Sequence, residues 1–348
     1  MVINVKIAID KKSLKAIKPK NEYIYLFKDE TIRELLDTKL HCIRYDKCKY
    51  VDINLTDYEV DCLKKSNINE KDFDKMTEKK EFLISIVIPN CNYAEWLPKC
   101  FASILKQTYK NYEIVFVDDV STDNSIEIAK KFKNEFDKLC KGMKIIPLVQ
   151  KRLNGGSRNE AYLHLNEKTD FIYYVDADDW LLDEYVLEKI NSKLQMQPDV
   201  LFVGMSAFKN NVLKTCFIPK YQDKYEAIKG WSGSCGKVIK KELATRQECL
   251  YNEGTLKEDK NQHCKICIYM NTFALLQEPI YVWNQENAKS VTTVRDKIVW
   301  GTSTIRHYAD TLQLYLSEKG KDKIIDEYLE ERLKKTREEM ENGKDRQW

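Results

Sequence analysis

Short apolar segments alternate with amphipathic segments through the middle of the chain. The apolar segments are continuous, which is typical of strands buried on both faces of a sheet; they cover residues 83–88, 112–117, 144–148 and 171–175. The amphipathic segments have helical spacing and cover residues 97–105, 125–136 and 157–165. Strands that alternate with helices predict an α/β fold with a mostly parallel central sheet flanked by helices.

Polar residues gather where the predicted strands end. These clusters occupy residues 90–93, 118–123, 155–159 and 176–179. In a parallel sheet, ligands bind outside the carboxyl ends of the strands, so the convergence of four polar clusters at these ends predicts one binding site.

The densest of these clusters is Asp176-Ala177-Asp178-Asp179. Three carboxylates at the mouth of a strand repel one another and persist most easily around a positive charge. Hard oxygen ligands suit Mg²⁺ or Mn²⁺ that carries a diphosphate. An acidic loop that caps the next helix is the alternative, but the position at a strand end, beside the other polar clusters, favours a metal–diphosphate site.

The pattern differs before residue 81. A small α+β module is predicted there, from strand patterns at 2–9 and 23–27 and helical spacing at 31–40. Residues 64–81 are predicted to form a helix and a linker. We expect three regions in the chain: an N-terminal accessory module at 1–80, a catalytic domain at 81–295 and a C-terminal helical extension at 296–348.

The part of the chain after residue 230 begins with a loop of small residues at 230–236. Glu258 and Asp259 precede a helical stretch at 262–269, and 279–283 reads as a further strand. Residues 297–343 mix apolar and charged positions with helical spacing. We expect a helical pair packed on the catalytic domain there, with a membrane-surface or oligomerising role as the alternative.

Composition limits the possible functions. The chain has 348 residues, a net charge of +3 and 32% charged residues, which is too mildly basic for a dedicated polyanion binder. The 11 Cys residues are scattered and odd in number, which favours a reducing compartment. Cys264 and Cys267 form a lone C-x-x-C beside His263, and without a second pair zinc or redox use is disfavoured. No apolar run approaches membrane-spanning length, so we expect a cytoplasmic protein, at most peripheral to a membrane.

Five motifs in this order resemble the start of a family 2 glycosyltransferase of the GT-A fold. They are Ile-Ser-Ile-Val-Ile-Pro at 84–89, Ser-Ile-Leu-Lys-Gln-Thr-Tyr at 103–109, the segment 113–125 with its Asp118-Asp119 pair, Gly-Ser-Arg-Asn at 156–159, and Val175 to Trp180. The resemblance covers about residues 82–295. It implies an inverting transferase that uses a nucleotide-diphosphate sugar, most often a UDP-sugar, with Mn²⁺ or Mg²⁺.

The resemblance also implies roles for single residues. Asp119 corresponds to the carboxylate that accepts a hydrogen bond from the uracil ring, and Asp178 to the metal ligand. The remaining residues of the implied nucleotide and metal site are Pro89, Asn92, Asp118, Arg158, Asn159, Asp176 on the ribose side, Ala177, and Asp179 in support of the metal.

Glu258 and Asp259 resemble the acidic pair of the family, whose Asp is the general base. An inverting displacement needs a carboxylate opposite the leaving group, to take the proton of the attacking hydroxyl. We therefore expect Asp259 to be the base rather than Glu258. The N-terminus of a surface helix would also favour two acids here.

The chain departs from the family pattern near the base pocket. Cys91 stands where the family commonly has an aromatic residue, so Tyr93 or Trp96 would have to supply the ring. Val120 stands where Gly is usual, so the loop backbone must accept a β-branched residue. Gln285 lacks the Arg-Trp that would complete a Q-x-x-R-W element, so a processive polymer synthase is not expected.

These motifs do not identify the acceptor of the sugar. A saccharide or lipid-linked acceptor of a surface glycan is the first hypothesis. The second is a hydroxymethylated base in DNA, suggested by the Lys- and Tyr-rich N-terminal module and the mild basicity. A non-catalytic nucleotide-sugar binding module is the third, and the complete acidic cluster disfavours it. The sequence leaves the oligomeric state open.

Overall fold

The computed structural model describes residues 5–8, 24–27, 80–288 and 297–342. The chain divides into two compact units, Met1–Lys80 and Glu81–Trp348. In the first unit, β1 (Val5–Ala8) pairs in parallel with β2 (Ile24–Phe27), at both places where strands were predicted. The helices predicted at 31–40 and within 64–79 lie outside the described residues.

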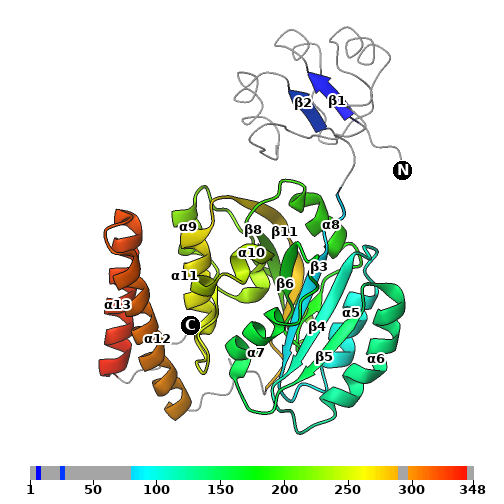
Figure 1. The fold of residues 1–348 in the computed structure, drawn as a ribbon, viewed down its shortest axis with the longest axis horizontal. Helices are drawn as coiled ribbons and strands as arrows, with labels where there is room; N and C mark the ends of the chain where they lie inside the picture. The colour runs from blue at the N-terminus through cyan, green and yellow to red at the C-terminus, as the bar shows by residue number, and fades with distance from the viewer. Residues whose placement is uncertain (1–4, 9–23, 28–79, 289–296, 343–348) are drawn as a thin grey trace. The chain divides into compact units, whose positions relative to one another are not determined.

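The second unit is built on a nine-stranded sheet (Figure 1). Its first half is parallel, and the strands lie in the order β5 (Met143–Pro147), β4 (Tyr112–Asp118), β3 (Ile84–Asn90) and β6 (Phe171–Tyr174). Every residue of β3, β4 and β6 is buried. The continuous apolar runs therefore predicted these strands correctly, because both faces of the sheet are covered.

The second half of the sheet is mixed. Strand β10 (Lys237–Lys240) is antiparallel to both β6 and β8 (Val200–Lys209), and β8 is parallel to β11 (Phe273–Asn284). Strand β7 (Trp180–Leu181) is antiparallel to β11 and ends the strand order on this side, and β9 (Val212–Phe217) pairs antiparallel with β8. The sheet is thus mixed rather than uniformly parallel, and the sequence predicted only part of β11 in this half.

Two hydrophobic clusters cover the two faces of the sheet. One contains Ile84, Ile86 and Ile88 of β3 with the buried sides of α5 (Leu97–Leu105), α6 (Ser125–Leu139) and α8 (Val186–Leu194). The other contains Val87 of β3 and the helices of the opposite face, α7 (Leu153–Tyr162), α9 (Lys224–Ile228), α10 (Lys241–Ala244) and α11 (Glu258–Tyr269). This period of two along β3 gives the sheet a core on each side.

The C-terminal helices α12 (Lys297–Glu318) and α13 (Lys323–Asn342) form a pair beside α11 (Figure 1). Leu314, Tyr315, Ile325 and Leu329 are buried and extend the second cluster. The predicted helical pair packed on the rest of the unit is therefore present. Among the described residues, no helix is both long and apolar enough to cross a membrane.

Candidate active site

The polar clusters at the strand ends meet at one edge of the sheet. Since β3, β4 and β6 are parallel, Asn90, Asp118 and segment 176–179 leave the sheet on the same side. Asn90 Nδ2 donates to Asp118 Oδ1 at 2.7 Å. Ser121 donates its hydroxyl to Asp118 Oδ1 at 2.6 Å and its backbone N–H to Oδ2 at 2.9 Å. Asp118 therefore closes the turn that follows β4.

Asp119, which was expected beside the uracil ring, holds the start of α7 in this structure. Its Oδ1 accepts the N–H of Arg152 at 2.7 Å, and its Oδ2 accepts the N–H of Leu153 at 2.8 Å. These are amides at a helix start, which has no intrahelical acceptors for them. Each carboxylate oxygen has a second lone pair, so Asp119 can still accept one further N–H.

The turn after Asp119 has a left-handed backbone. Val120, at the position where Gly was expected, has a φ of 59°, and Asn92 has a φ of 61°. Asn tolerates this region, whereas a β-branched residue is strained there. Asn92 Oδ1 accepts the N–H of Thr122 at 2.7 Å, so Asn92 shapes the turn, while Pro89 lies buried inside β3.

Arg158 joins three carboxylates at the centre of the site. Its Nη2 donates to Asp176 Oδ1 at 2.8 Å, and its Nη1 donates to Glu258 Oε1 at 3.0 Å and Asp259 Oδ1 at 3.1 Å. The Arg158 side chain is only 1% exposed. Burial alone would lower the pKa of Arg158, but the charges of Asp259 and Asp176 outweigh burial and raise it well above its usual value. The guanidinium therefore links residues that lie about a hundred positions apart in the sequence.

A glycine allows α7 and α11 to approach each other closely enough for this contact. A Cβ on Gly155 would lie 2.9 Å from the carbonyl oxygen of Asn252 and 3.1 Å from Glu258 Cγ. The backbone oxygen cannot move away easily, so a side chain at position 155 would separate the two helices. Gly155 therefore keeps Arg158 within reach of α11.

The acidic pair of α11 divides into a buried and an exposed carboxylate. The Glu258 side chain is 6% exposed and the Asp259 side chain is 34% exposed. Burial and the charge of Asp259 raise the pKa of Glu258 to about 8. One guanidinium neutralises only one of its three acids, so a proton on the most buried acid is physically reasonable. Asp259 remains as the carboxylate that is open to solvent.

Ser234, which the sequence analysis did not single out, also orients Asp259. Its hydroxyl donates to Asp259 Oδ1 and lies 2.6 Å from the hydroxyl of Tyr251. Ser234 begins the short 3-10 turn Ser234–Gly236 within the predicted small-residue loop. The fully buried Lys237 holds this loop, since its Nζ donates to the carbonyl oxygens of Ser232 at 2.8 Å and Gly233 at 2.7 Å.

The acidic segment 176–179 forms a turn followed by strand β7, so it does not cap a helix. Asp176 points to Arg158, as described above, and Asp178 Oδ2 accepts from Asn287 Nδ2 at 2.8 Å. Burial and the charge of Asp176 raise the pKa of Asp178 to about 6. Ala177 is completely buried beneath this turn.

Asp179 has a different environment from Asp176 and Asp178. Its Oδ2 accepts the hydroxyl of Tyr281 at 2.6 Å, and its Oδ1 accepts the N–H of Asn284 at 2.7 Å. Both oxygens therefore bind β11 rather than a shared centre. Within the part of the chain that the structure describes, no three His, Cys, Asp or Glu side chains are grouped so as to hold a metal ion.

Asn159 lies beside the site rather than in it. Its side chain forms a pair of hydrogen bonds with the backbone of Tyr251, at 2.9 Å in each direction, and its Nδ2 also donates to Glu253 at 3.1 Å. Asn159 therefore fixes the loop that carries Tyr251 toward Ser234, and its amide is occupied by the protein itself.

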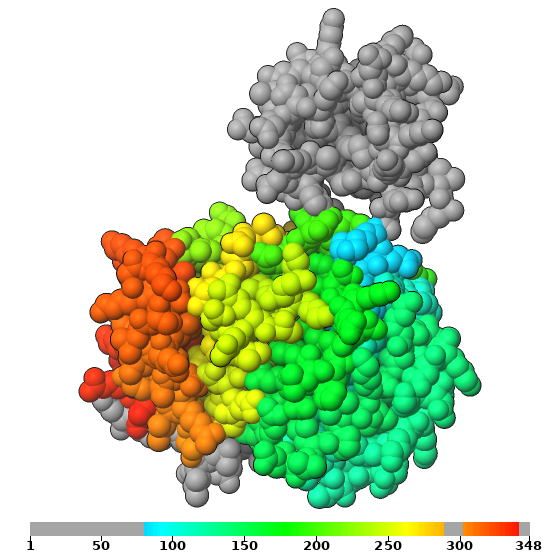
Figure 2. Space-filling view, viewed as in Figure 1, coloured from blue at the N-terminus to red at the C-terminus, as the bar shows by residue number. Residues whose placement is uncertain are grey.

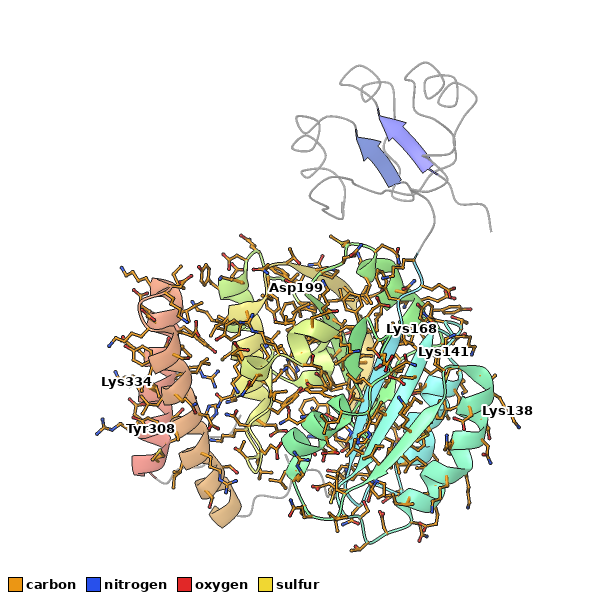
Figure 3. All side chains as sticks on the ribbon, in the orientation of Figure 1. Lys138, Lys141, Lys168, Asp199, Tyr308 and Lys334 are labelled. Carbon is orange, nitrogen blue, oxygen red and sulfur yellow. The ribbon has the colours of Figure 1, made fainter. Side chains whose placement is uncertain are left out.

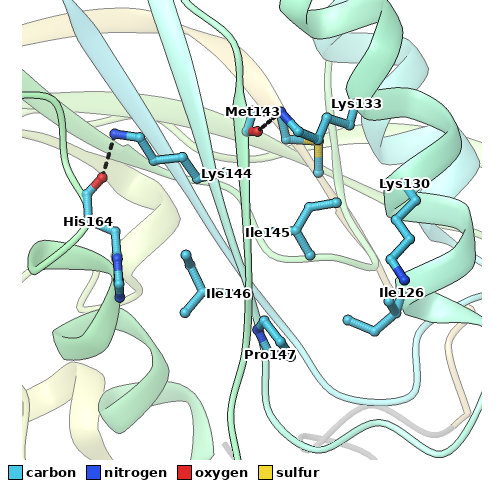
Figure 4. A pocket seen from close by; sticks show the side chains of 9 residues that line it. All are labelled: Ile126, Lys130, Lys133, Met143, Lys144, Ile145, Ile146, Pro147 and His164. Carbon is cyan, nitrogen blue, oxygen red and sulfur yellow. Dashed lines mark hydrogen bonds between the residues drawn. The ribbon is translucent and has the colours of Figure 1, made fainter.

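A separate hollow of about 630 Å³ lies between α6 and the edge strand β5 (Figure 4). Its lining includes Lys130, Lys133 and Lys144 but none of the carboxylates of the site. Lys133 Nζ donates to the carbonyl oxygen of Met143, and Lys144 Nζ donates to that of His164. Further exposed lysines lie on this side of the molecule, at Lys138, Lys141 and Lys168 (Figure 3). The hollow is therefore distinct from the acidic site at the strand ends.

A mixed α/β sheet with an acidic turn at the carboxyl ends of its parallel strands is the arrangement of a GT-A fold. Residues 85–232 match the family model described as "Glycosyl transferase family 2", and this part of the chain belongs to that family. The first half of the sheet and the acidic turn lie within the matched residues, whereas Glu258 and Asp259 lie beyond them.

Two curated relatives and one solved structure are similar to this chain. The glycosyltransferase GlyA of Streptococcus pneumoniae is 27% identical over 58% of this chain and 30% of its own length. The poly(ribitol-phosphate) beta-glucosyltransferase of Bacillus spizizenii is 32% identical over 34% of this chain and 18% of its own length. The chain thus spans less than a third of the length of either relative.

The crystal structure of residues 1–349 of TarS from Staphylococcus aureus, in complex with UDP-GlcNAc, aligns with a TM-score of 0.56. It covers 66% of this chain and 67% of that chain at 18% identity. At this identity the similarity supports the fold alone, and it agrees with the GT-A arrangement of the sheet.

Proposed function

We propose that this protein is a metal-dependent inverting glycosyltransferase that moves a sugar from a UDP-sugar to a hydroxyl of a surface-glycan acceptor. The observation that carries the proposal is the buried Arg158, which joins Asp176 on the donor side to Asp259 on the acceptor side. A transferase needs donor and acceptor groups held in one fixed geometry, because positioning supplies a large part of the rate.

On the donor side, Asp178 and Asp176 are the residues that would hold Mn²⁺ or Mg²⁺. The donor set fits such an ion, since both are hard carboxylates and the raised pKa of Asp178 reflects burial and repulsion that a cation would relieve. Mg²⁺ commonly takes only one or two protein carboxylates and completes its shell with phosphate and water. When bound, the ion supplies Lewis-acid stabilisation of the leaving diphosphate.

On the acceptor side, Asp259 takes the proton of the attacking hydroxyl. Arg158 and Ser234 both donate to its Oδ1 and so fix the orientation of the carboxylate. Glu258 lies behind the same guanidinium and is nearly excluded from solvent. Asp259 is therefore the acid of the pair that an incoming hydroxyl can reach.

The acceptor that we favour is a saccharide, polymer or lipid-linked glycan. The Bacillus relative is named for transfer of glucose to poly(ribitol-phosphate), and it is 32% identical to this chain over 123 residues. A modified DNA base, the alternative considered from the sequence, has no observation in the described residues that favours it.

A donor-hydrolysis screen tests the proposal without knowledge of the acceptor. The protein is incubated with UDP-, GDP- and dTDP-sugars with Mn²⁺, and again with a chelator in place of the metal. We expect slow release of UDP from a UDP-sugar, with release lost in the chelator. Release of nucleotide from none of the three donor classes, with or without saccharide primers, would refute the assignment.

A further inference from the structure

The helix that carries Glu258 and Asp259 does not fix its own start. Lys257 is the N-cap of α11, and its side chain makes no capping hydrogen bond. The segment that leads into the helix begins at Gly254, which has a φ of 69°. Capping side chains normally hold the first amides of a helix in place, so the start of α11 must be held by other contacts.

Those contacts come from α12. The hydroxyl of Ser303 accepts the N–H of Leu256 at 3.1 Å, and the carbonyl oxygen of Ser303 accepts the hydroxyl of Thr255 at 3.4 Å. Thr255 Oγ1 in turn accepts the N–H of Lys257 at 3.3 Å. Ser303 and Thr255 are each 2% exposed, so these bonds are shielded from water.

An ion pair from α13 reinforces the same segment. Lys257 Nζ donates to Thr304 Oγ1 and to Glu339 Oε2, each at 3.0 Å, and the side chains of Lys257 and Glu339 are 8% and 18% exposed. Arg306 donates to the carbonyl oxygen of Gly254. Each of the four residues Gly254 to Lys257 is therefore bonded to α12 or α13.

The two helices also bind α11 beyond its first turn. Thr311 Oγ1 donates to Asn261 Oδ1 at 3.2 Å, and at the far end of α11 the hydroxyl of Tyr269 donates to Glu318 at 2.7 Å. Figure 2 shows the orange and red surface of α12 and α13 directly against the yellow surface of this part of the chain. The contacts near Gly254 to Lys257 adjoin the acidic pair, whereas the Tyr269 contact is three turns away.

We infer that the C-terminal helical pair positions the general base. Ser303, Thr304 and Glu339 are positioning residues that act through the segment Gly254–Lys257 on Asp259. This inference rests on the proposed function for the role of Asp259. A catalytic carboxylate that moves by about 1 Å can lose about a hundredfold in rate, so contacts behind the helix start influence the chemical step.

Two variants test the inference, Ser303→Ala and Glu339→Gln. The matched control is Tyr269→Phe, which removes one hydrogen bond between α11 and α12 at the other end of α11. We expect both test variants to lower kcat for transfer by about tenfold or more while the KM for the donor stays within about twofold. The control should retain kcat even where its melting temperature falls by a similar amount.

Hydrogen exchange of the amides of residues 255–259 provides a readout that does not need activity. We expect faster exchange at these amides in both test variants and unchanged exchange in Tyr269→Phe. Unchanged exchange in the test variants, or a kcat loss equal to that of the control, would overturn the inference. If the wild-type protein transfers no sugar, the proposed function fails, and the exchange experiment still decides whether α12 and α13 order the start of α11.

Discussion

The clearest prediction distinguishes the two acids of α11. Asp259→Asn should leave donor binding intact and reduce transfer by about 10²–10⁴-fold, the range that general-base catalysis contributes. That loss corresponds to about 2.7–5.5 kcal/mol of barrier, at about 1.36 kcal/mol per decade. Asn keeps the size of the side chain and one oxygen for Arg158 and Ser234, so the effect should arise from the lost base.

The matched variant is Glu258→Gln, and the structure predicts a much smaller effect for it. With a pKa raised to about 8 by burial and by Asp259, Glu258 is mainly protonated at pH 7. Gln resembles this neutral form and can still accept from Arg158. Transfer should therefore fall by only a few-fold.

The assay is initial-rate transfer to a saccharide primer, followed as UDP release, with donor affinity measured by calorimetry on the same preparations. An equal collapse in both variants would show that the pair acts as a unit. Near-normal turnover in Asp259→Asn with a collapse in Glu258→Gln would place the base at Glu258 and refute the reasoning from exposure.

Three further predictions address the rest of the site. Asp178→Asn should abolish the Mn²⁺-dependent part of UDP-sugar binding in calorimetry, and unchanged affinity in Mn²⁺ would exclude it as a ligand. Ser234→Ala should lower kcat about tenfold, because a hydrogen bond to a charged group contributes about 1.5–3 kcal/mol; a rate equal to wild type would show that Arg158 alone orients Asp259. Because the pKa of Glu258 is raised in the folded protein, protonation of Glu258 contributes to the stability of the fold. This contribution is fully present below about pH 4.5 and is lost as the pH rises through about 8. The melting temperature of wild type should therefore fall more steeply than that of Glu258→Gln between about pH 5 and 8, and parallel curves would contradict the assigned shift.

Strands β3, β4 and β6 of the parallel half were predictable because they are buried on both faces and therefore carry continuous apolar runs. In the mixed half of the sheet, only part of β11 was predicted. Strand β9 is almost entirely exposed, and β10 contains the buried Lys237, whose charge hides the strand in a hydropathy pattern. A usable signal was present at Asn210-Asn211, whose φ values of 52° and 59° match the tight hairpin between β8 and β9.

The start of α7 could not be derived from local sequence. It was predicted at Ser157 but lies at Leu153, because the acceptor for its first amides is Asp119, more than thirty residues earlier. The start of α11 was likewise expected at Gln262 but lies at Glu258. In both cases tertiary contacts, rather than a local capping residue, set the boundary.

The candidate site residues were selected one at a time, from the polar clusters near the predicted strand ends and from the acidic pair at 258–259. Their grouping was not predictable, because the contact of Arg158 with Glu258 and Asp259 depends on how two distant helices cross. Ser234 escaped notice for a simpler reason: a serine in a loop of small residues has no periodic pattern. The general base and the metal ligands remain predictions.

The outer edge of the sheet at β5 has a consequence for how the protein behaves when concentrated. An unpaired strand edge is a template on which another chain can add a strand and begin to aggregate. Here the ammonium of Lys133 donates a hydrogen bond to the carbonyl oxygen of Met143, at one end of β5. Pro147, at the other end of β5, has no backbone N–H to donate. A strand that approached this edge would have to displace a lysine and would find no donor at the proline. The edge therefore ends the sheet and resists its extension into a fibre.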